Sequence, residues 1–129
     1  MATVNINETE FEKLILEKGT VLVDFWAAWC GPCRSFAPVY EATSEKYPDL
    51  TFAKVDTEAE QSLAAAAGIT SIPTLMVFRD GILLFSQPGA LPGPALEEII
   101  GKVAELDMDD VRKQIADQEL TTSKKDETA

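Results

Sequence analysis

Apolar positions along the first hundred residues follow two periods, one typical of buried strands and one typical of amphipathic helices. Residues 21–26 are almost uniformly apolar, which predicts a central strand buried on both faces, with Asp24 as the exception. Helical spacing recurs after Pro94, where we expect a helix that packs on a sheet through Leu96, Ile99, Ile100 and Val103. The pattern therefore predicts an α/β fold.

Further apolar runs complete the predicted sheet. Strands are expected at residues 4–6, 51–56, 75–79 and 82–86, and helices after Asn7 and over 34–46 and 59–67. The helix over 34–46 links two of the strands, so a right-handed crossover should make those strands parallel. Asp80 and Gly81 favour a type I′ hairpin turn, which pairs the last two strands antiparallel. We therefore expect a mixed sheet with parallel and antiparallel strands.

Local signals refine the predicted helices. Asn7 stands three positions before Glu10, which matches a capping box, and Lys18 and Gly19 should end the first helix. Pro38 removes a backbone hydrogen bond and should kink the second helix near its first turns. The alternative is that this helix starts later.

The periodic pattern weakens near the C-terminus. We divide the chain into a domain over residues 1–106 and a C-terminal extension over 107–129. Asp107 could cap a short helix in which only Val111 and Ile115 offer apolar burial. Residues 121–129 are polar without a period, so we expect a frayed tail. We favour a solvated extension without a function over a docking element.

Composition and charge narrow the function. A chain of 129 residues can form one domain with its own apolar core, without a structural metal or disulfide. The formal net charge of -11 disfavours nucleic acid and anionic membranes as partners, because both repel an acidic surface. We find no N-terminal leader and no apolar run that could cross a bilayer, and we expect a cytoplasmic protein. Histidine is absent, so proton transfer must fall to carboxylates, thiols, lysine, tyrosine or water.

The two cysteines, Cys30 and Cys33, are the main candidates for chemistry. Their spacing at the start of a helix brings the Cα atoms within the roughly 4.4–6.8 Å that a disulfide requires, so the pair can open and close without moving the fold. The helix N-terminus should stabilise a thiolate at Cys30 and lower its pKa. Pro32 suits the first helical position, and Gly31 lets a partner's backbone approach closely.

The sequence around these cysteines resembles the thioredoxin family. Residues 29–33 read WCGPC and follow Val-Asp-Phe-Trp-Ala-Ala. Further matching stretches, in the family's order and spacing, are residues 54–56, 72–75, 80–81 and 89–91. The resemblance runs from about Val4 to about Val103. It implies a thioredoxin fold, in which a central mixed sheet is flanked by helices on both faces.

In this context redox chemistry is favoured over two other roles for the cysteine pair. Zinc requires about four nitrogen or sulfur ligands, and the chain offers no histidine and no further cysteine, so only a dimer that shares two pairs could bind it. A purely structural disulfide would close too short a loop to constrain the unfolded chain. We therefore expect no bound metal.

The resemblance implies a role for a third residue. The family's aspartate at the position of Asp24 assists proton transfer with the second cysteine, here Cys33. The apolar neighbours of Asp24 also suggest that its carboxyl group is buried and has a raised pKa, rather than lying exposed at a strand end. Lys54 is the candidate partner of Asp24, and Trp26 is expected in the core.

The resemblance also implies a substrate groove. The family has a cis peptide bond at Ile72-Pro73, in a loop that faces the first cysteine and pairs with the backbone of the incoming disulfide. Residues expected at the groove are Thr70, Ser71, Ile72 and Pro73 on one wall, Gly89, Ala90 and Leu91 on the other, and Gly31 and Pro32 at the motif. Trp29 is expected to contact partners rather than to pack as a lid on its own sheet.

A reversible dithiol at Cys30 and Cys33 implies a thiol-disulfide oxidoreductase. By resemblance, it is a general reductase of disulfide-containing proteins. A flavin- and NADPH-dependent thioredoxin reductase would restore the dithiol, while this chain binds no cofactor of its own. We expect a monomer. The alternative is a non-catalytic binding or chaperone module, since thioredoxin folds also serve as partner subunits.

Overall fold

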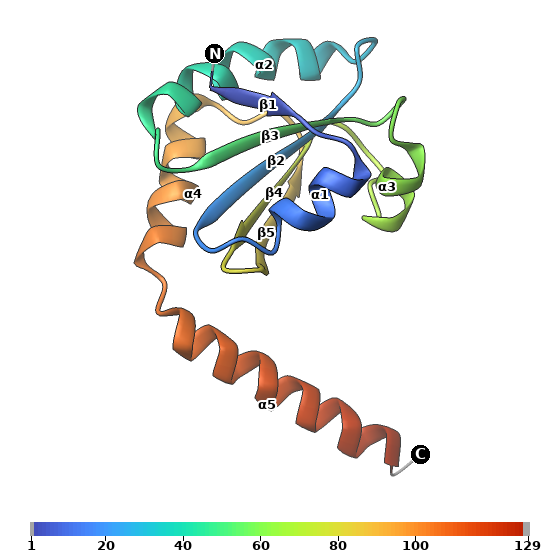
Figure 1. Ribbon diagram of the computed structural model, residues 1–129, viewed down its shortest axis with the longest axis vertical. Helices are drawn as coiled ribbons and strands as arrows, with labels where there is room; N and C mark the ends of the chain where they lie inside the picture. The colour runs from blue at the N-terminus through green and yellow to red at the C-terminus, as the bar shows by residue number, and fades with distance from the viewer. Residues whose placement is uncertain (1, 128–129) are drawn as a thin grey trace.

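The computed structural model describes residues 2–127, with side chains up to residue 119. Within this part the strands form one five-stranded sheet in the order β1-β3-β2-β4-β5 (Figure 1). The strands are β1 (Thr3–Asn5), β2 (Thr20–Trp26), β3 (Thr51–Asp56), β4 (Thr74–Arg79) and β5 (Ile82–Pro88). β1, β3 and β2 run parallel to one another, and the pairs β2–β4 and β4–β5 are antiparallel. The predicted mixed sheet is confirmed.

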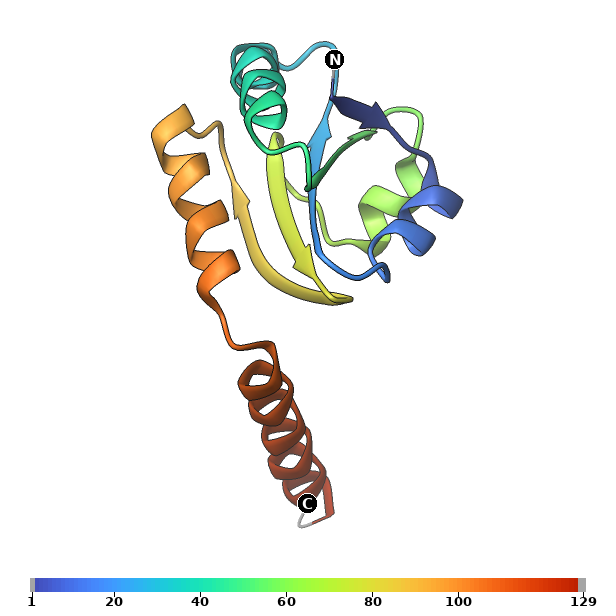
Figure 2. The ribbon, with the colours of Figure 1, turned by 60° about the vertical axis from the view of Figure 1, so that its left-hand side comes forward.

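Helices cover both faces of this sheet, as Figure 2 shows. α1 (Glu8–Leu14) and α3 (Gln61–Ala66) lie on one face, and α2 (Gly31–Lys46) and α4 (Gly93–Glu105) lie on the other. Each face has its own apolar cluster, one built around Phe11 and Phe25 and one around Tyr40 and Leu96. The predicted fold class, a mixed sheet between two helical layers, is therefore confirmed.

β2 takes the centre of the sheet because both of its faces are apolar. Val23 and Phe25 enter the cluster under α1 and α3, whereas Leu22 enters the cluster under α2 and α4. A strand that is covered on both faces lacks the polar alternation of a half-exposed strand. By the same alternation, Asp24 faces the side of the sheet that α2 covers.

The hairpin between β4 and β5 has the predicted geometry. Asp80 and Gly81 have φ angles of 52° and 84°, and a type I′ turn requires positive φ at both central residues. Asp80 Oδ1 also accepts a hydrogen bond of 2.8 Å from the backbone N–H of Gly19. The turn thereby joins the loop that precedes β2.

Several helix boundaries differ from the sequence predictions. α1 ends at Leu14 rather than at Lys18, because the amides of Leu16 and Glu17 donate to carbonyls three residues back and form a tighter turn. α3 begins at Gln61 rather than at residue 59, because Asp56 Oδ1 accepts the N–H of Glu58 at 2.9 Å and holds residues 57–59 in a turn. Strand ends differ from prediction by one or two residues.

The start of α2 also corrects a prediction. The helix begins at Gly31, three residues earlier than predicted, with Cys30 as its N-cap residue. Pro32 therefore occupies the second helical position, where its missing N–H still removes no intrahelical hydrogen bond. Pro38 lies inside α2, so the alternative of a helix that starts later is wrong.

The C-terminal extension forms α5 (Met108–Glu127), a helix of 20 residues that runs away from the domain (Figure 1). Asp107 Oδ1 accepts the N–H of Asp109 at 3.0 Å, as the predicted cap requires. The helix is longer than the short one we predicted and includes residues 121–127, where we expected a frayed tail; residues 128 and 129 lie outside the described part. A periodic pattern of apolar residues marks a helix that is buried on one face. Glu, Gln and Lys favour helix even where no such face exists, so a solvated helix carries no periodic signal. The division of the chain at residue 106 stays a prediction.

The first turns of α5 are attached to the domain. Met108 is only 7% exposed, which corrects our expectation that Val111 and Ile115 alone would offer apolar burial. Arg112 Nη2 lies 3.6 Å from Asp80 Oδ2 in the hairpin turn. The start of the extension is therefore attached through the buried Met108 and the ion pair between Arg112 and Asp80.

Candidate active site

Cys30 and Cys33 form a disulfide between the end of β2 and the start of α2. Their Cα atoms are 5.2 Å apart, within the range that disulfides adopt. The two residues are only 4% and 3% exposed, whereas Gly31 and Pro32 between them are exposed. A partner's backbone can therefore reach the motif through these two residues.

The start of α2 favours negative charge on one sulfur. The backbone N–H of Cys33 donates to Cys30 Sγ over 3.2 Å, so Cys30 caps the helix with its own sulfur. Cys30 also lies at the positive end of a helix of 16 residues. When the disulfide is reduced, both interactions stabilise a thiolate on Cys30.

Asp24 is a buried carboxylate on the side of the sheet that α2 covers. It is 1% exposed, and neither of its oxygens has a hydrogen-bond partner among the described residues. Burial raises the pKa of Asp24 to about 7, and the positive charge of Lys54 opposes part of that rise. The predicted burial and raised pKa are therefore confirmed. A carboxyl group with this pKa can accept and release a proton near neutral pH.

Lys54 lies beside Asp24 without forming an ion pair with it. The two residues are paired in the parallel register of β2 and β3. The Lys54 ammonium lies over the ring of Trp26, 4.8 Å from the ring centroid. Lys54 thus acts on Asp24 through its electric field and not through contact.

Trp26 was expected in the core and is only half-buried. Its ring packs against the cluster of Ala27, Cys30 and Cys33 as well as lying under Lys54. Trp26 and Asp24 are two positions apart on β2, so their side chains point to the same face of the sheet. This spacing in the sequence would have allowed Trp26 to be predicted near Asp24.

The loop before β4 lies against the cysteines. The Ile72-Pro73 peptide bond is cis, as the resemblance implied, and the carbonyl oxygen of Ile72 lies 3.6 Å from Cys30 Sγ. A cavity of about 330 Å³ opens beside this loop. Its lining includes four of the predicted substrate-facing residues, namely Trp29, Thr70, Ser71 and Ile72.

The second predicted wall is only partly brought to this loop. The backbone N–H of Gly89 donates to the carbonyl of Pro73 over 2.7 Å, which places Gly89 next to the loop. Ala90 is exposed and Leu91 packs on the cluster under α4, and neither lines the cavity beside Ile72.

Trp29 is exposed, as expected for a residue that contacts partners. It is 66% exposed, and its indole Nε1 donates to Glu58 Oε1 over 2.6 Å. Sequence reasoning missed Glu58 because it belongs to no motif and follows β3, far along the chain from Trp29.

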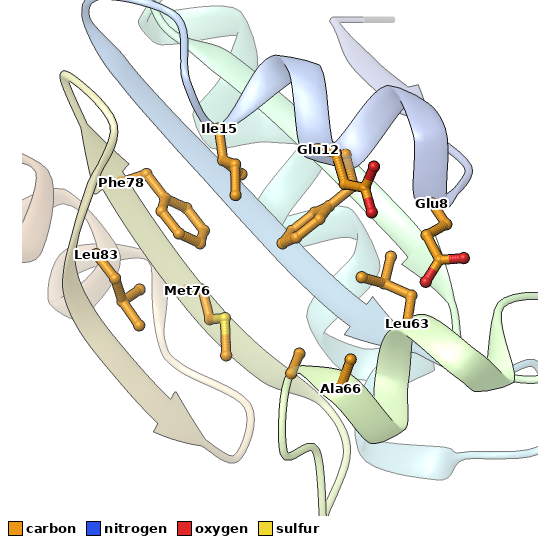
Figure 3. Close-up of a pocket in the computed structure, with 10 residues that line it drawn as sticks. Glu8, Glu12, Ile15, Leu63, Ala66, Met76, Phe78 and Leu83 are labelled. Atoms are coloured by element: carbon orange, nitrogen blue, oxygen red, sulfur yellow. The ribbon is translucent and has the colours of Figure 1, made fainter.

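A second cavity, of about 400 Å³, lies on the face of the sheet that α1 and α3 cover (Figure 3). Side chains of α1, α3, β4 and β5 line it, with Phe78, Met76 and Leu63 pointing inward and Glu8 and Glu12 at one edge. None of its lining residues is a predicted site residue, so this cavity is separate from the cysteine site.

In the part of the chain that the structure describes, no helix is long and apolar enough to cross a membrane.

Comparison with known proteins agrees with this geometry. The family model described as Thioredoxin matches residues 2–105. A protein named "Putative thioredoxin 2" from Streptomyces coelicolor is 52% identical over 118 residues, which cover 92% of this chain and 88% of the relative. The match of 118 residues is longer than the part of the chain that precedes α5, which begins at Met108, so the match includes part of α5.

Solved structures are similar as well. A mutant thioredoxin from Halobacterium salinarum has a TM-score of 0.75 at 35% identity, covering 81% of this chain and 93% of that one. A chain of the structure named "Structural basis of the thiol resolving mechanism in yeast mitochondrial 1-Cys peroxiredoxin via glutathione/thioredoxin systems" has a TM-score of 0.72 at 32% identity, with coverages of 78% and 95%.

Proposed function

The chain belongs to the thioredoxin family, and from that membership we propose that it is a general reductase of protein disulfides. It is a thiol-disulfide oxidoreductase whose active site is the Cys30–Cys33 pair. The observation that carries the proposal is the donation from the Cys33 N–H to Cys30 Sγ at the start of α2, because it distinguishes an attacking sulfur from a resolving one.

The first step is attack by the Cys30 thiolate on a substrate disulfide. A bond forms between Cys30 Sγ and one substrate sulfur, the substrate S–S bond breaks, and the other sulfur leaves as a thiolate that takes a proton from water. The cavity beside Ile72 and the exposed ring of Trp29 support a substrate segment bound along this loop.

The second step uses Cys33. Its thiol gives a proton to the Asp24 carboxylate, and the resulting thiolate attacks Cys30 Sγ. The Cys30–Cys33 bond forms, the mixed disulfide breaks, and the second substrate sulfur leaves as a thiolate that takes a proton from water. The Asp24 carboxyl group then releases the Cys33 proton to water. Two electrons have passed from the dithiol to the substrate. Asp24 suits this role because it faces the side covered by α2, where Cys33, Phe36 and Tyr40 form the buried stripe of the helix.

The oxidised pair must then be reduced by a partner. We assign this step to a flavin- and NADPH-dependent thioredoxin reductase, and disulfide-containing proteins are the substrates. A similar chain occurs in a structure on thiol resolution in a yeast peroxiredoxin via glutathione and thioredoxin systems, which supports a protein partner with redox-active thiols. The reductase is inferred from membership in the family. We also propose that the protein is a monomer, that it works in the cytoplasm and that it binds no cofactor of its own.

An insulin-reduction assay tests the function. With NADPH and thioredoxin reductase, the chain should reduce insulin and produce turbidity, and Cys30→Ser should abolish the reaction. A wild-type chain that fails to reduce insulin while still binding protein partners would instead identify a non-catalytic binding module.

A further inference from the structure

The Lys54 ammonium has two possible partners nearby, the ring of Trp26 and the carboxylate of Asp24. Asp24 and Lys54 are direct neighbours in the β2–β3 register, close enough for a lysine side chain to reach the carboxylate. The ammonium lies instead 4.8 Å from the Trp26 ring centroid, and both Asp24 oxygens lack a hydrogen-bond partner among the described residues. The face of a tryptophan ring is the strongest aromatic site for a cation.

We propose that Trp26 is a positioning residue, whose ring holds the Lys54 ammonium out of contact with the Asp24 carboxylate and so leaves that carboxylate free to take the proton of Cys33. The inference rests on the proposed function, since it explains how Asp24 remains a usable base. A contact ion pair would stabilise the ionised form and make Asp24 a weaker proton acceptor.

The other groups near Asp24 do not replace Lys54 in this arrangement. Tyr40 of α2 donates its hydroxyl to the carbonyl of Ala53 over 2.8 Å and so is committed elsewhere. Glu41 of α2 also feels the Lys54 charge, but its carboxylate accepts hydrogen bonds from Thr3 and from the Ala2 N–H. Asp56, the register partner of Trp26 on β3, accepts the N–H of Glu58 at its Oδ1 over 2.9 Å. Cys33 of α2 is the proposed proton donor in the reduced protein.

A double-mutant cycle tests the proposal, with wild type, Trp26→Leu, Lys54→Met and the double variant. The pKa of Asp24 is measured by carboxyl ¹³C NMR on the oxidised protein, in which no thiol titrates. With Lys54 present, Trp26→Leu should lower the Asp24 pKa by about one unit, because the freed ammonium approaches the carboxylate. In the Lys54→Met background the same change should have a much smaller effect.

Two results would overturn the proposal. An equal fall in both backgrounds means that Trp26 only excludes water, and a rise with Lys54 present means that the ring brings the ammonium toward Asp24. Trp26→Phe keeps a smaller ring face and should shift the pKa in the same direction by less. That variant serves if Trp26→Leu does not fold, and an unchanged pKa there would overturn the proposal equally.

Kinetics link the arrangement to the reaction. The pH midpoint of mixed-disulfide resolution should move down with the Asp24 pKa in Trp26→Leu. A midpoint that does not move would overturn the link to Cys33. The NMR cycle needs no turnover, so a chain that reduces no disulfide would refute the proposed function without deciding the role of Trp26.

Discussion

The backbone N–H of Cys33 donates to Cys30 Sγ over 3.2 Å, so one cysteine stabilises the other through its main chain rather than its side chain. Replacing the Cys33 side chain therefore leaves this donor in place. The attacking and resolving functions can be separated by mutation for that reason.

Cys33→Ser should trap substrates as mixed disulfides on Cys30. The Cys30 thiolate keeps its donor and its helix terminus, but no second thiol remains to release the substrate. Affinity capture from a lysate, followed by elution with dithiothreitol, should recover at least about tenfold more protein than Cys30→Ser does. Equal recovery from the two variants would reverse the assigned order of attack.

Glu58→Ala should weaken substrate binding more than chemistry. The hydrogen bond from Trp29 Nε1 to Glu58 fixes an exposed ring beside the cavity lined by Thr70 and Ile72. A hydrogen bond of this kind is worth about 0.5–1.5 kcal/mol, so KM for a protein disulfide should rise about two- to tenfold while kcat changes little. Steady-state insulin reduction measures both constants.

Glu58→Gln is the matched control, because glutamine keeps the length of the side chain and one acceptor oxygen while losing the charge. Its KM should stay near that of wild type. If both variants raise KM equally, the charge of Glu58 matters and the position of the Trp29 ring does not.

The central part of the site was predictable because its signals are local. The uniform apolarity of residues 21–26 predicts the buried strand, and one carboxylate within that run predicts the raised pKa of Asp24. The substrate-facing loop came from the family's pattern and not from any period in the sequence.

Other features depend on side-chain positions that no periodic pattern encodes. The start of α3 is decided by one hydrogen bond to the Asp56 carboxylate. The place of the Lys54 ammonium is decided by competition between a ring and a carboxylate, and the pairing of Trp29 with Glu58 requires the folded sheet. The length of α5 was missed because a solvated helix needs no apolar stripe.

Truncation should show that only the start of the C-terminal extension contributes to stability. Removing residues 116–129 should leave the thermal midpoint within about one degree, since this part follows the attached turns. Removing residues 107–129 also deletes the buried Met108 and the Arg112–Asp80 ion pair, and should lower the free energy of unfolding by about 1.5–3 kcal/mol. Urea melts measure the difference.

Two point variants separate the contributions of Met108 and Arg112 to this loss in the free energy of unfolding. Met108→Ala should reproduce most of it, whereas Arg112→Ala should cost under about 1 kcal/mol because the Arg112 side chain is half-exposed. Insulin reduction should be unchanged in both. A raised KM for the reductase in the longer truncation would mean that α5 binds a partner.

Asp24→Asn should stabilise the protein at neutral pH and little in acid. The folded pKa of Asp24, about 7, lies above its ordinary value of 3.8, so the folded state binds more protons than the unfolded state between these values. The stability due to the protonated carboxyl group is complete below pH 3.8 and is lost as pH rises to about 7. A difference of about three pH units corresponds to an upper limit of about 4 kcal/mol.

The variant should therefore gain up to that amount at pH 8 and almost nothing at pH 4, as measured by urea melts at both values. Asp49→Asn removes the same charge from an exposed position and is the matched control for the change in net charge. The Asp24 change also removes the proposed proton acceptor, so single-turnover resolution by Cys33 should slow about tenfold or more while attack by Cys30 changes less. A neutral-pH midpoint that does not rise would mean that Lys54 pairs firmly with Asp24 in solution. An unchanged resolution rate would assign the Cys33 proton to another acceptor.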